Sequence, residues 1–80
     1  MTRLLPKFMG WTQEVPSGTV NGSNVTFTLA STPYDASTLG LYVNGIAQRL
    51  TTDYTISGAT ITFVSAPATS SDIYARYRKV

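Results

Sequence analysis

Hydrophobic residues alternate with polar ones over much of the second half of the chain, which is the pattern of half-buried β-strands. The clearest case is residues 39–50, where hydrophobic positions recur at every second residue on either side of Asn44-Gly45. Asn-Gly is the strongest short-range hairpin signal, because both turn positions need a positive φ. The predicted register opposes Val43 with Ile46, Leu41 with Gln48, and Leu39 with Leu50.

A second hairpin is predicted over residues 54–64, around Ser57-Gly58. Its hydrophobic and polar residues separate by parity, so that one face of the hairpin belongs to the core and the other faces water. The hydrophobic face comprises Tyr54, Ile56, Ala59, Ile61 and Phe63, and the polar face comprises Thr55, Thr60 and Thr62.

Short strands are also predicted at residues 12–15, 25–30 and 73–80, with a four-residue hairpin loop at 21–24. Asp35 is expected to close an Asx-turn in the connection before the first hairpin. Helical periodicity is absent. The sequence therefore predicts an all-β fold, a small antiparallel β-sandwich or partly open barrel of about six short strands with an extended N-terminal arm.

The alternation also predicts which side chains form the core. Ten are expected to be buried: Val25, Phe27, Leu29, Leu41, Val43, Ile46, Ile56, Ile61, Phe63 and Ile73. Tyr54 and Tyr77 are expected on inward faces as well. We expect residues 1–12 to be an anchoring arm and residues 13–80 to be a single small β domain.

The amino-acid composition limits the kinds of stabilising and catalytic site that the chain can form. The 80 residues include no Cys and no His, so a disulfide or a zinc site of the usual ligands cannot stabilise so small a core. Stabilisation by a neighbouring subunit is the leading alternative. Acid–base catalysis usually recruits His or a pair of carboxylates in a cleft, whereas the four acidic residues fall at predicted turns or strand ends. We expect no enzymatic activity, no cofactor and no metal.

Basic residues gather at the two ends of the chain. Arg3 and Lys7 precede residue 12, and Arg76, Arg78 and Lys79 lie close to the C-terminus, whereas residues 12–75 carry one Arg against four acidic residues. The basic ends of one copy of the chain could attract the acidic middle of another copy. Alternatively, the C-terminal charges only keep a terminal edge strand soluble. The basic residues are too sparse to predict nucleic-acid binding, and no stretch is long enough to predict a membrane span.

The first eleven residues are rich in large hydrophobic side chains, which favours an arm that lies on another subunit over an ordinary first strand. Tyr42 and Tyr74 are predicted on outer strand faces, where they could contact a sugar or a protein, or pair only with cross-strand neighbours. The candidate partner-interface residues are Arg3, Leu4, Leu5, Lys7, Phe8, Trp11, Tyr42, Tyr74, Arg76 and Arg78.

An ordered set of short motifs covers roughly residues 15–78. It comprises Gly18, Asn21 and Phe27-Thr28-Leu29, then Val43-Asn44-Gly45 with Gln48, then Asp53-Tyr54-Thr55, Ile61-Thr62-Phe63 and Ala66-Pro67. In this order the set resembles a short β-module that recurs in tail, tail-fibre and head-surface proteins of tailed bacteriophages. Residues 1–12 match nothing in that module.

The resemblance implies a non-enzymatic structural or attachment role in the virion, for example in capsid decoration, the head-tail connector, the tail or a tail fibre. The implied partners are other virion proteins, either capsid, connector or tail, with several copies forming a homo-oligomer and with no nucleic acid or membrane bound. The alternative is a receptor- or glycan-binding module of a tail appendage.

Overall fold

The structure, a computed structural model, describes residues 11–79. These residues form two antiparallel sheets. The four-stranded sheet has the order β1-β7-β3-β4 and the three-stranded sheet the order β2-β6-β5. The elements are β1 (Trp11–Glu14), β2 (Thr26–Thr28), the 3₁₀ turn η1 (Ala36–Thr38), β3 (Gly40–Val43), β4 (Ile46–Ala47), β5 (Tyr54–Ser57), β6 (Thr60–Phe63) and β7 (Ile73–Arg78).

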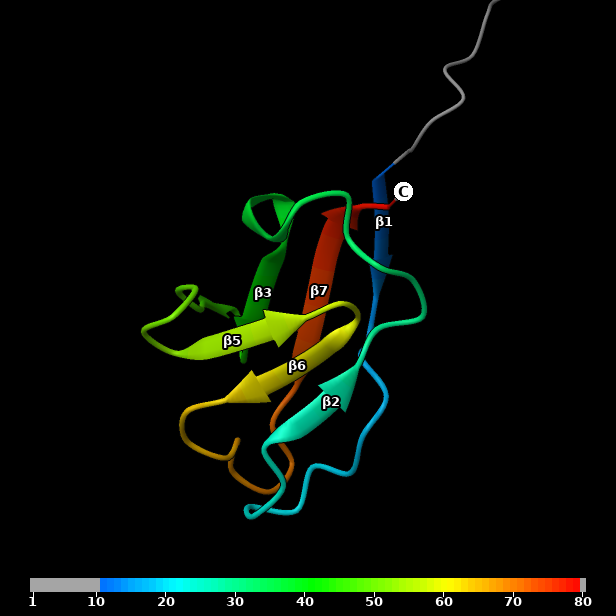
Figure 1. The fold of residues 1–80 in the computed structure, drawn as a ribbon. Coiled ribbons are helices and arrows are strands. Elements are labelled where there is room, and N and C mark those ends of the chain that lie inside the picture. Colours follow the sequence, from blue (N-terminus) through cyan, green and yellow to red (C-terminus); the bar gives the residue numbers. More distant parts are fainter. Residues whose placement is uncertain (1–10, 80) are drawn as a thin grey trace, which may run out of the picture.

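The two sheets pack face to face as a small sandwich, with no closed barrel. Figure 1 shows β5, β6 and β2 crossing in front of β3, β7 and β1. The chain changes sheet after β1, β2, β4 and β6, so that neighbours in sequence often lie in different sheets. This confirms the predicted all-β sandwich, with seven strands, one of which has only two residues.

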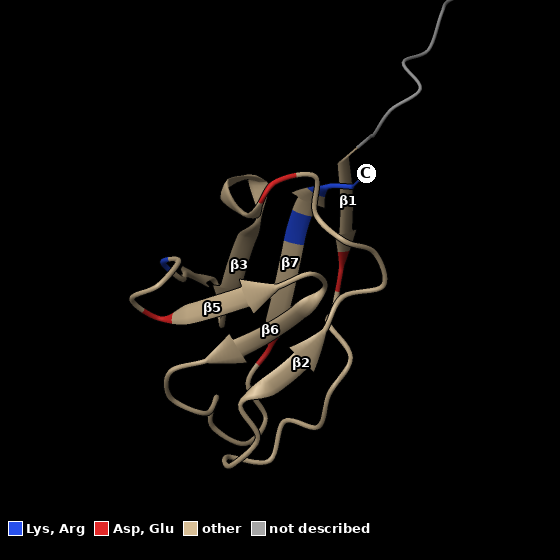
Figure 2. Ribbon diagram, in the orientation of Figure 1, with Lys and Arg blue, Asp and Glu red and all other residues tan. Residues whose placement is uncertain are grey.

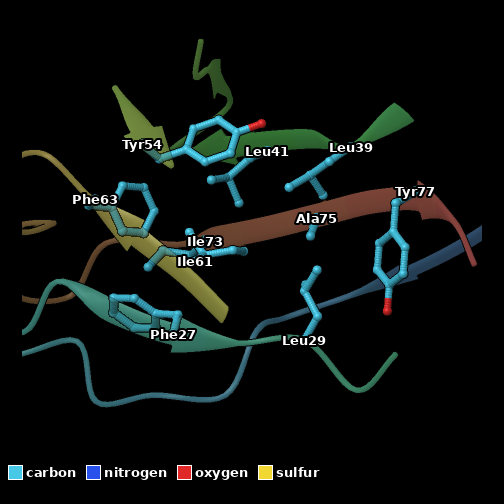
Figure 3. Close-up of a cluster of buried hydrophobic side chains, with 10 residues drawn as sticks. All are labelled: Phe27, Leu29, Leu39, Leu41, Tyr54, Ile61, Phe63, Ile73, Ala75 and Tyr77. Carbon is cyan, nitrogen blue, oxygen red and sulfur yellow. The ribbon is translucent and has the colours of Figure 1, made fainter. Parts of the chain in front are cut away.

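Ten buried hydrophobic residues fill the space between the sheets (Figure 3). The rings of Phe27 and Phe63 meet edge to face, with centroids 5.5 Å apart and an interplanar angle of 84°, which is a favourable aromatic geometry. The full set is Phe27, Leu29, Leu39, Leu41, Tyr54, Ile61, Phe63, Ile73, Ala75 and Tyr77. Of the ten predicted core residues six are among them, while Val25, Val43 and Ile56 are half-buried and pack against the cluster.

The prediction for Ile46 is wrong, since this side chain is 67% exposed. Val43 does pair with Ile46, and Asn44 and Gly45 both have positive φ, so the turn and its register are confirmed. However, the ladder ends at Ala47 and does not reach Leu50, which instead bridges to Tyr54. β4 packs mainly against β3, and so its inward face lies beyond the cover of the other sheet.

Two other turns differ in detail from the predictions. In the second hairpin Ser57 pairs with Thr60, so the turn residues are Gly58 and Ala59, one position later than expected. The predicted hairpin loop at 21–24 is a turn, in which the Asn21 side chain accepts bonds from two backbone N–H groups. Only a single antiparallel bridge, between Ser17 and Thr28, joins the chain on the two sides of that turn. The strand of Phe27 forms its ladder with β6.

The last strand is not an edge strand. β7 lies between β1 and β3, and it is the longest strand of the described residues. The interpretation of its basic residues as protection for a terminal edge is therefore wrong. Because β7 is central, every second side chain along it lies within the outer face of the four-stranded sheet and not at its edge.

Candidate functional site

The outer face of the four-stranded sheet collects most of the candidate side chains that the structure describes. Register places Trp11 opposite Arg78, Gln13 opposite Arg76, and Tyr42 opposite Tyr74. We use the term outer face for Trp11, Gln13, Gly40, Tyr42, Ala47, Tyr74, Arg76 and Arg78, which share one side because Cβ atoms alternate along each strand. No acidic residue belongs to this set.

Two arginines on the outer face lie against aromatic rings. The Arg76 guanidinium carbon is 4.8 Å from the Trp11 ring centroid, and that of Arg78 is 5.4 Å from the Tyr34 ring centroid. Both distances fall within the range of cation–π contacts. In Figure 2 the basic residues of β7 and of the segment after it lie at the end of the sheet where β1 begins. The contacts place two planar, charged groups against aromatic rings at the surface.

A hollow of about 310 Å³ opens on the outer face between β3 and β7. The rings of Tyr42 and Tyr74 form its aromatic surface, with centroids 6.3 Å apart and planes tilted by 45°. Gly40 leaves the space that the Tyr42 ring occupies, because a Cβ at Gly40 would come within 3.3 Å of that ring. Three further residues complete the lining: Gly45, Asp72 and Arg76. We call this hollow the tyrosine cavity.

The rim of the tyrosine cavity is held by the Asn44-Gly45 turn. The backbone N–H of Asn44 donates to the carbonyl of Asp72 at 2.8 Å, and the side-chain oxygen of Asn44 accepts from the N–H of Asp72 at 2.9 Å. These two bonds attach the turn to the start of β7. The Asp72 carboxylate makes no hydrogen bond within the described part of the chain, and so remains available to a ligand.

A polar network at the other end holds β1, and with it Trp11, against the sandwich. The Tyr77 hydroxyl donates to the Glu14 carboxylate and accepts from the N–H of Ser31 at 3.2 Å. The same carboxylate accepts from the N–H of Ala30. Burial raises the pKa of the Tyr77 hydroxyl, and the bond to the Glu14 carboxylate raises it further. Tyr77 therefore stays a neutral donor at any physiological pH.

The remaining carboxylates have structural roles. Asp35 accepts from the N–H of Ser37 and caps η1, as predicted, and Asp53 accepts from the N–H of Arg49. Among residues 11–79, no three potential ligands approach closely enough to hold a metal ion. A smaller hollow of about 160 Å³ lies between residues 32–36 and the end of β5.

Within the described residues there is no helix long and apolar enough to span a membrane.

The predicted interface residues divide into three groups. Trp11 and Arg78 lie at the β1 end of the outer face, Tyr42, Tyr74 and Arg76 meet at the tyrosine cavity, and five lie outside the described residues: Arg3, Leu4, Leu5, Lys7 and Phe8. Sequence reasoning missed Asp72 as a surface residue of this site. The signal was present, because residues 72, 74, 76 and 78 have the same parity.

The fold and this face define a small all-β sandwich with an aromatic and basic surface. Comparison with protein-family models, curated proteins and solved structures finds nothing that matches the chain.

Proposed function

We propose that this chain is a non-enzymatic structural protein of a tailed-bacteriophage virion, where it docks on a capsid, connector or tail protein. Docking uses its N-terminal segment and the neighbouring edge of β1. The resemblance over residues 15–78 supports the virion setting. The same mode of attachment applies to a location on the head and to a location on the tail of the particle. Several copies per particle follow from the symmetry of such assemblies.

The observation that carries the proposal is the exposure of Trp11, the only tryptophan of the chain. Its side chain is 54% exposed although it begins a strand of the sheet. Tryptophan and arginine are enriched among the residues that dominate binding energy at protein interfaces. Here the two are stacked on each other, and the ten preceding residues include Leu4, Leu5 and Phe8. An apolar segment joined to an exposed tryptophan suits a partner surface with a groove.

The edge of β1 adds to this argument. Within the described residues β1 pairs with β7 alone, and it contributes none of the ten buried hydrophobic residues. The sandwich core is thus complete without β1 side chains. One side of its backbone can accept a further strand, which is a common way for an extended segment to bind a sheet edge.

The residues that carry the resemblance have recognisable structural tasks. A Cβ at Gly18 would lie 2.4 Å from the Phe27 ring, so only glycine fits there. Asn21 and Asn44 hold turns, and Pro67 is buried. Residues with such tasks maintain the scaffold of the module, and this supports a structural role. Attachment is then assigned to residues 1–12, which do not match the module.

The test compares three proteins: the full chain, a chain that begins at Trp11, and the full chain with Leu4, Leu5 and Phe8 changed to serine. Particles assembled without the parent protein are incubated with each, and incorporation is measured by quantitative mass spectrometry. Val64→Ser provides the control, because this exposed side chain directly follows β6 of the three-stranded sheet, whereas β1 belongs to the four-stranded sheet.

We expect both altered N-termini to keep the circular dichroism melt of the parent and to lose incorporation, while Val64→Ser retains it. Normal incorporation of the truncated chain would overturn the anchoring role. Truncated protein that does not fold would also overturn it, since the segment would then belong to the core of this domain.

A further inference from the structure

We propose that the tyrosine cavity binds a neutral saccharide. The argument concerns Tyr42, Tyr74, Asp72 and Arg76, and it does not depend on the proposed virion role. The volume of about 310 Å³ lies at the lower end of the range for small-molecule sites. An open cavity of this size accommodates one or two sugar rings at the surface, with the rest of a chain leaving on either side.

The aromatic surface of the cavity suits the apolar face of a sugar ring. Tyr42 and Tyr74 face each other across β3 and β7 with a tilt of 45°, so that the two rings form an angled surface. Aromatic side chains combine a large apolar area with a polar end, and they lose little conformational entropy on binding. Tyr42 is further restricted by its packing over Gly40. The platform is therefore largely formed before any ligand arrives.

The polar groups of the cavity leave their hydrogen-bonding capacity unused within the described residues. Neither the Arg76 guanidinium nor the Asp72 carboxylate makes a hydrogen bond within residues 11–79, and the same holds for the hydroxyls of Tyr42 and Tyr74. Arg76 offers donors and Asp72 offers acceptors. A sugar carries adjacent hydroxyls that both donate and accept, which is what such a mixed set can satisfy.

Charge selects a neutral ligand. Of the cavity residues, Arg76 is positive and Asp72 negative, so the formal charges of the lining cancel. A carboxylate-bearing ligand would gain from Arg76 and be repelled by Asp72. An acidic peptide or a sialylated glycan is for this reason a poorer fit than a neutral sugar.

Two features hold the polar groups in place. Arg76 lies against Trp11, which limits the positions of its guanidinium, and the backbone of Asp72 is attached to Asn44 by two hydrogen bonds. Preorganisation of this kind reduces the entropy that binding would otherwise cost. It also gives the cavity a spectroscopic signal, because the guanidinium that would meet a ligand is in contact with Trp11, the only tryptophan of the chain.

The experiment titrates the full chain with cellobiose, maltose, lactose and chitobiose, each to about 20 mM, well above the dissociation constant of about 1 mM expected for an open site. Trp11 fluorescence and backbone amide NMR shifts are followed together. Sialyllactose and tetraglutamate are the charged comparison probes. We expect saturable shifts at Tyr42, Asp72, Tyr74 and Arg76 with at least one neutral disaccharide, accompanied by a change in Trp11 emission.

Variants separate binding in the cavity from weak binding elsewhere. Tyr74→Ala and Asp72→Ala should each weaken binding about fivefold or more. Arg76→Lys keeps the charge but not the planar donor set, and should remove most of the fluorescence response. Tyr34→Ala, an exposed tyrosine outside the cavity, should stay within about twofold of the parent. Circular dichroism melts establish that each variant is folded.

Three results would overturn the proposal. One is the absence of saturable shifts with every neutral disaccharide. Another is tighter binding of sialyllactose or tetraglutamate than of the neutral probes. The third is an affinity of Tyr74→Ala equal to that of Tyr34→Ala. Because the free protein is used, none of these results bears on whether the N-terminal segment anchors the chain in a particle.

Discussion

Replacement of Tyr77 by phenylalanine tests the network that attaches β1 to the sandwich. The ring of Tyr77 is fully buried, and its hydroxyl contacts the Glu14 carboxylate and the N–H of Ser31. Phenylalanine keeps the ring and the packing. Only the hydroxyl disappears, and with it a donor to a charged group and an acceptor for a backbone amide. The change therefore isolates the polar network from the hydrophobic core, to which the Tyr77 ring belongs (Figure 3).

The expected loss follows from the groups left behind. Hydrogen bonds to charged groups contribute about 1.5–3 kcal/mol. Glu14 is half-buried and keeps its bonds to Ala30, so water and that amide offset part of the loss. We expect the free energy of unfolding to fall by about 1.5–2 kcal/mol. Since a domain of 80 residues has a total stability of about 4–12 kcal/mol, this is a large fraction.

The measurement is a urea titration followed by circular dichroism, together with a thermal melt. A loss of about 1.5–2 kcal/mol corresponds to a midpoint lower by about 6–16 °C in a domain of this size. Tyr54→Phe is the matched control, because the Tyr54 hydroxyl makes no hydrogen bond within residues 11–79 while its ring is equally buried. That variant should stay within about 0.5 kcal/mol of the parent.

A double-mutant cycle with Glu14→Ala assigns the effect to the pair. The two changes should be non-additive by about 1 kcal/mol or more, since each removes the same contact. Equal stabilities of Tyr77→Phe and Tyr54→Phe would refute the reasoning. So would additive effects of the two substitutions in the cycle, because the hydroxyl and the carboxylate would then act independently.

Three further outcomes are expected. Phe27→Ala should lower the free energy of unfolding by about 3–5 kcal/mol in urea titrations, and a near-native midpoint would contradict the core described above. Gly18→Ala should destabilise more than Gly45→Ala in thermal melts, because a Cβ at Gly18 meets the Phe27 ring whereas one at Gly45 meets nothing within 4 Å; the reverse order would contradict this packing. Burial raises the pKa of Tyr54 and Tyr77 above 10.0, so the unfolded chain loses these protons at a lower pH than the folded chain does. The free energy of unfolding should therefore fall as the pH rises above about 10, and Tyr77→Phe should lessen this fall. A urea midpoint that does not change up to pH 11 would contradict this expectation.

Local sequence signals located most of the strands and the first hairpin turn. The alternation in residues 54–64 identified the second hairpin and its buried face, because side chains two apart must share a face of a strand. Asn44-Gly45 identified the first turn, since few other residues adopt two successive positive φ values. Tyr42 and Tyr74 were placed on outer faces by parity alone, and register sets them opposite each other.

Only the tertiary structure decided which strands are neighbours and how far each sheet extends. Ile46 has the correct parity for the core but lies at a corner that the second sheet does not cover, so it is exposed. β7 is central because β1 pairs with it across more than sixty residues of chain, and a pairing that distant leaves no local signal in sequence. The same pairing brings Trp11 to Arg76, while the β3–β7 ladder brings Tyr42 to Tyr74 and the Asn44-Gly45 turn to Asp72. Sequence periodicity determines the face on which a residue lies, whereas the juxtaposition of residues from distant strands depends on burying the most apolar surface across the whole chain.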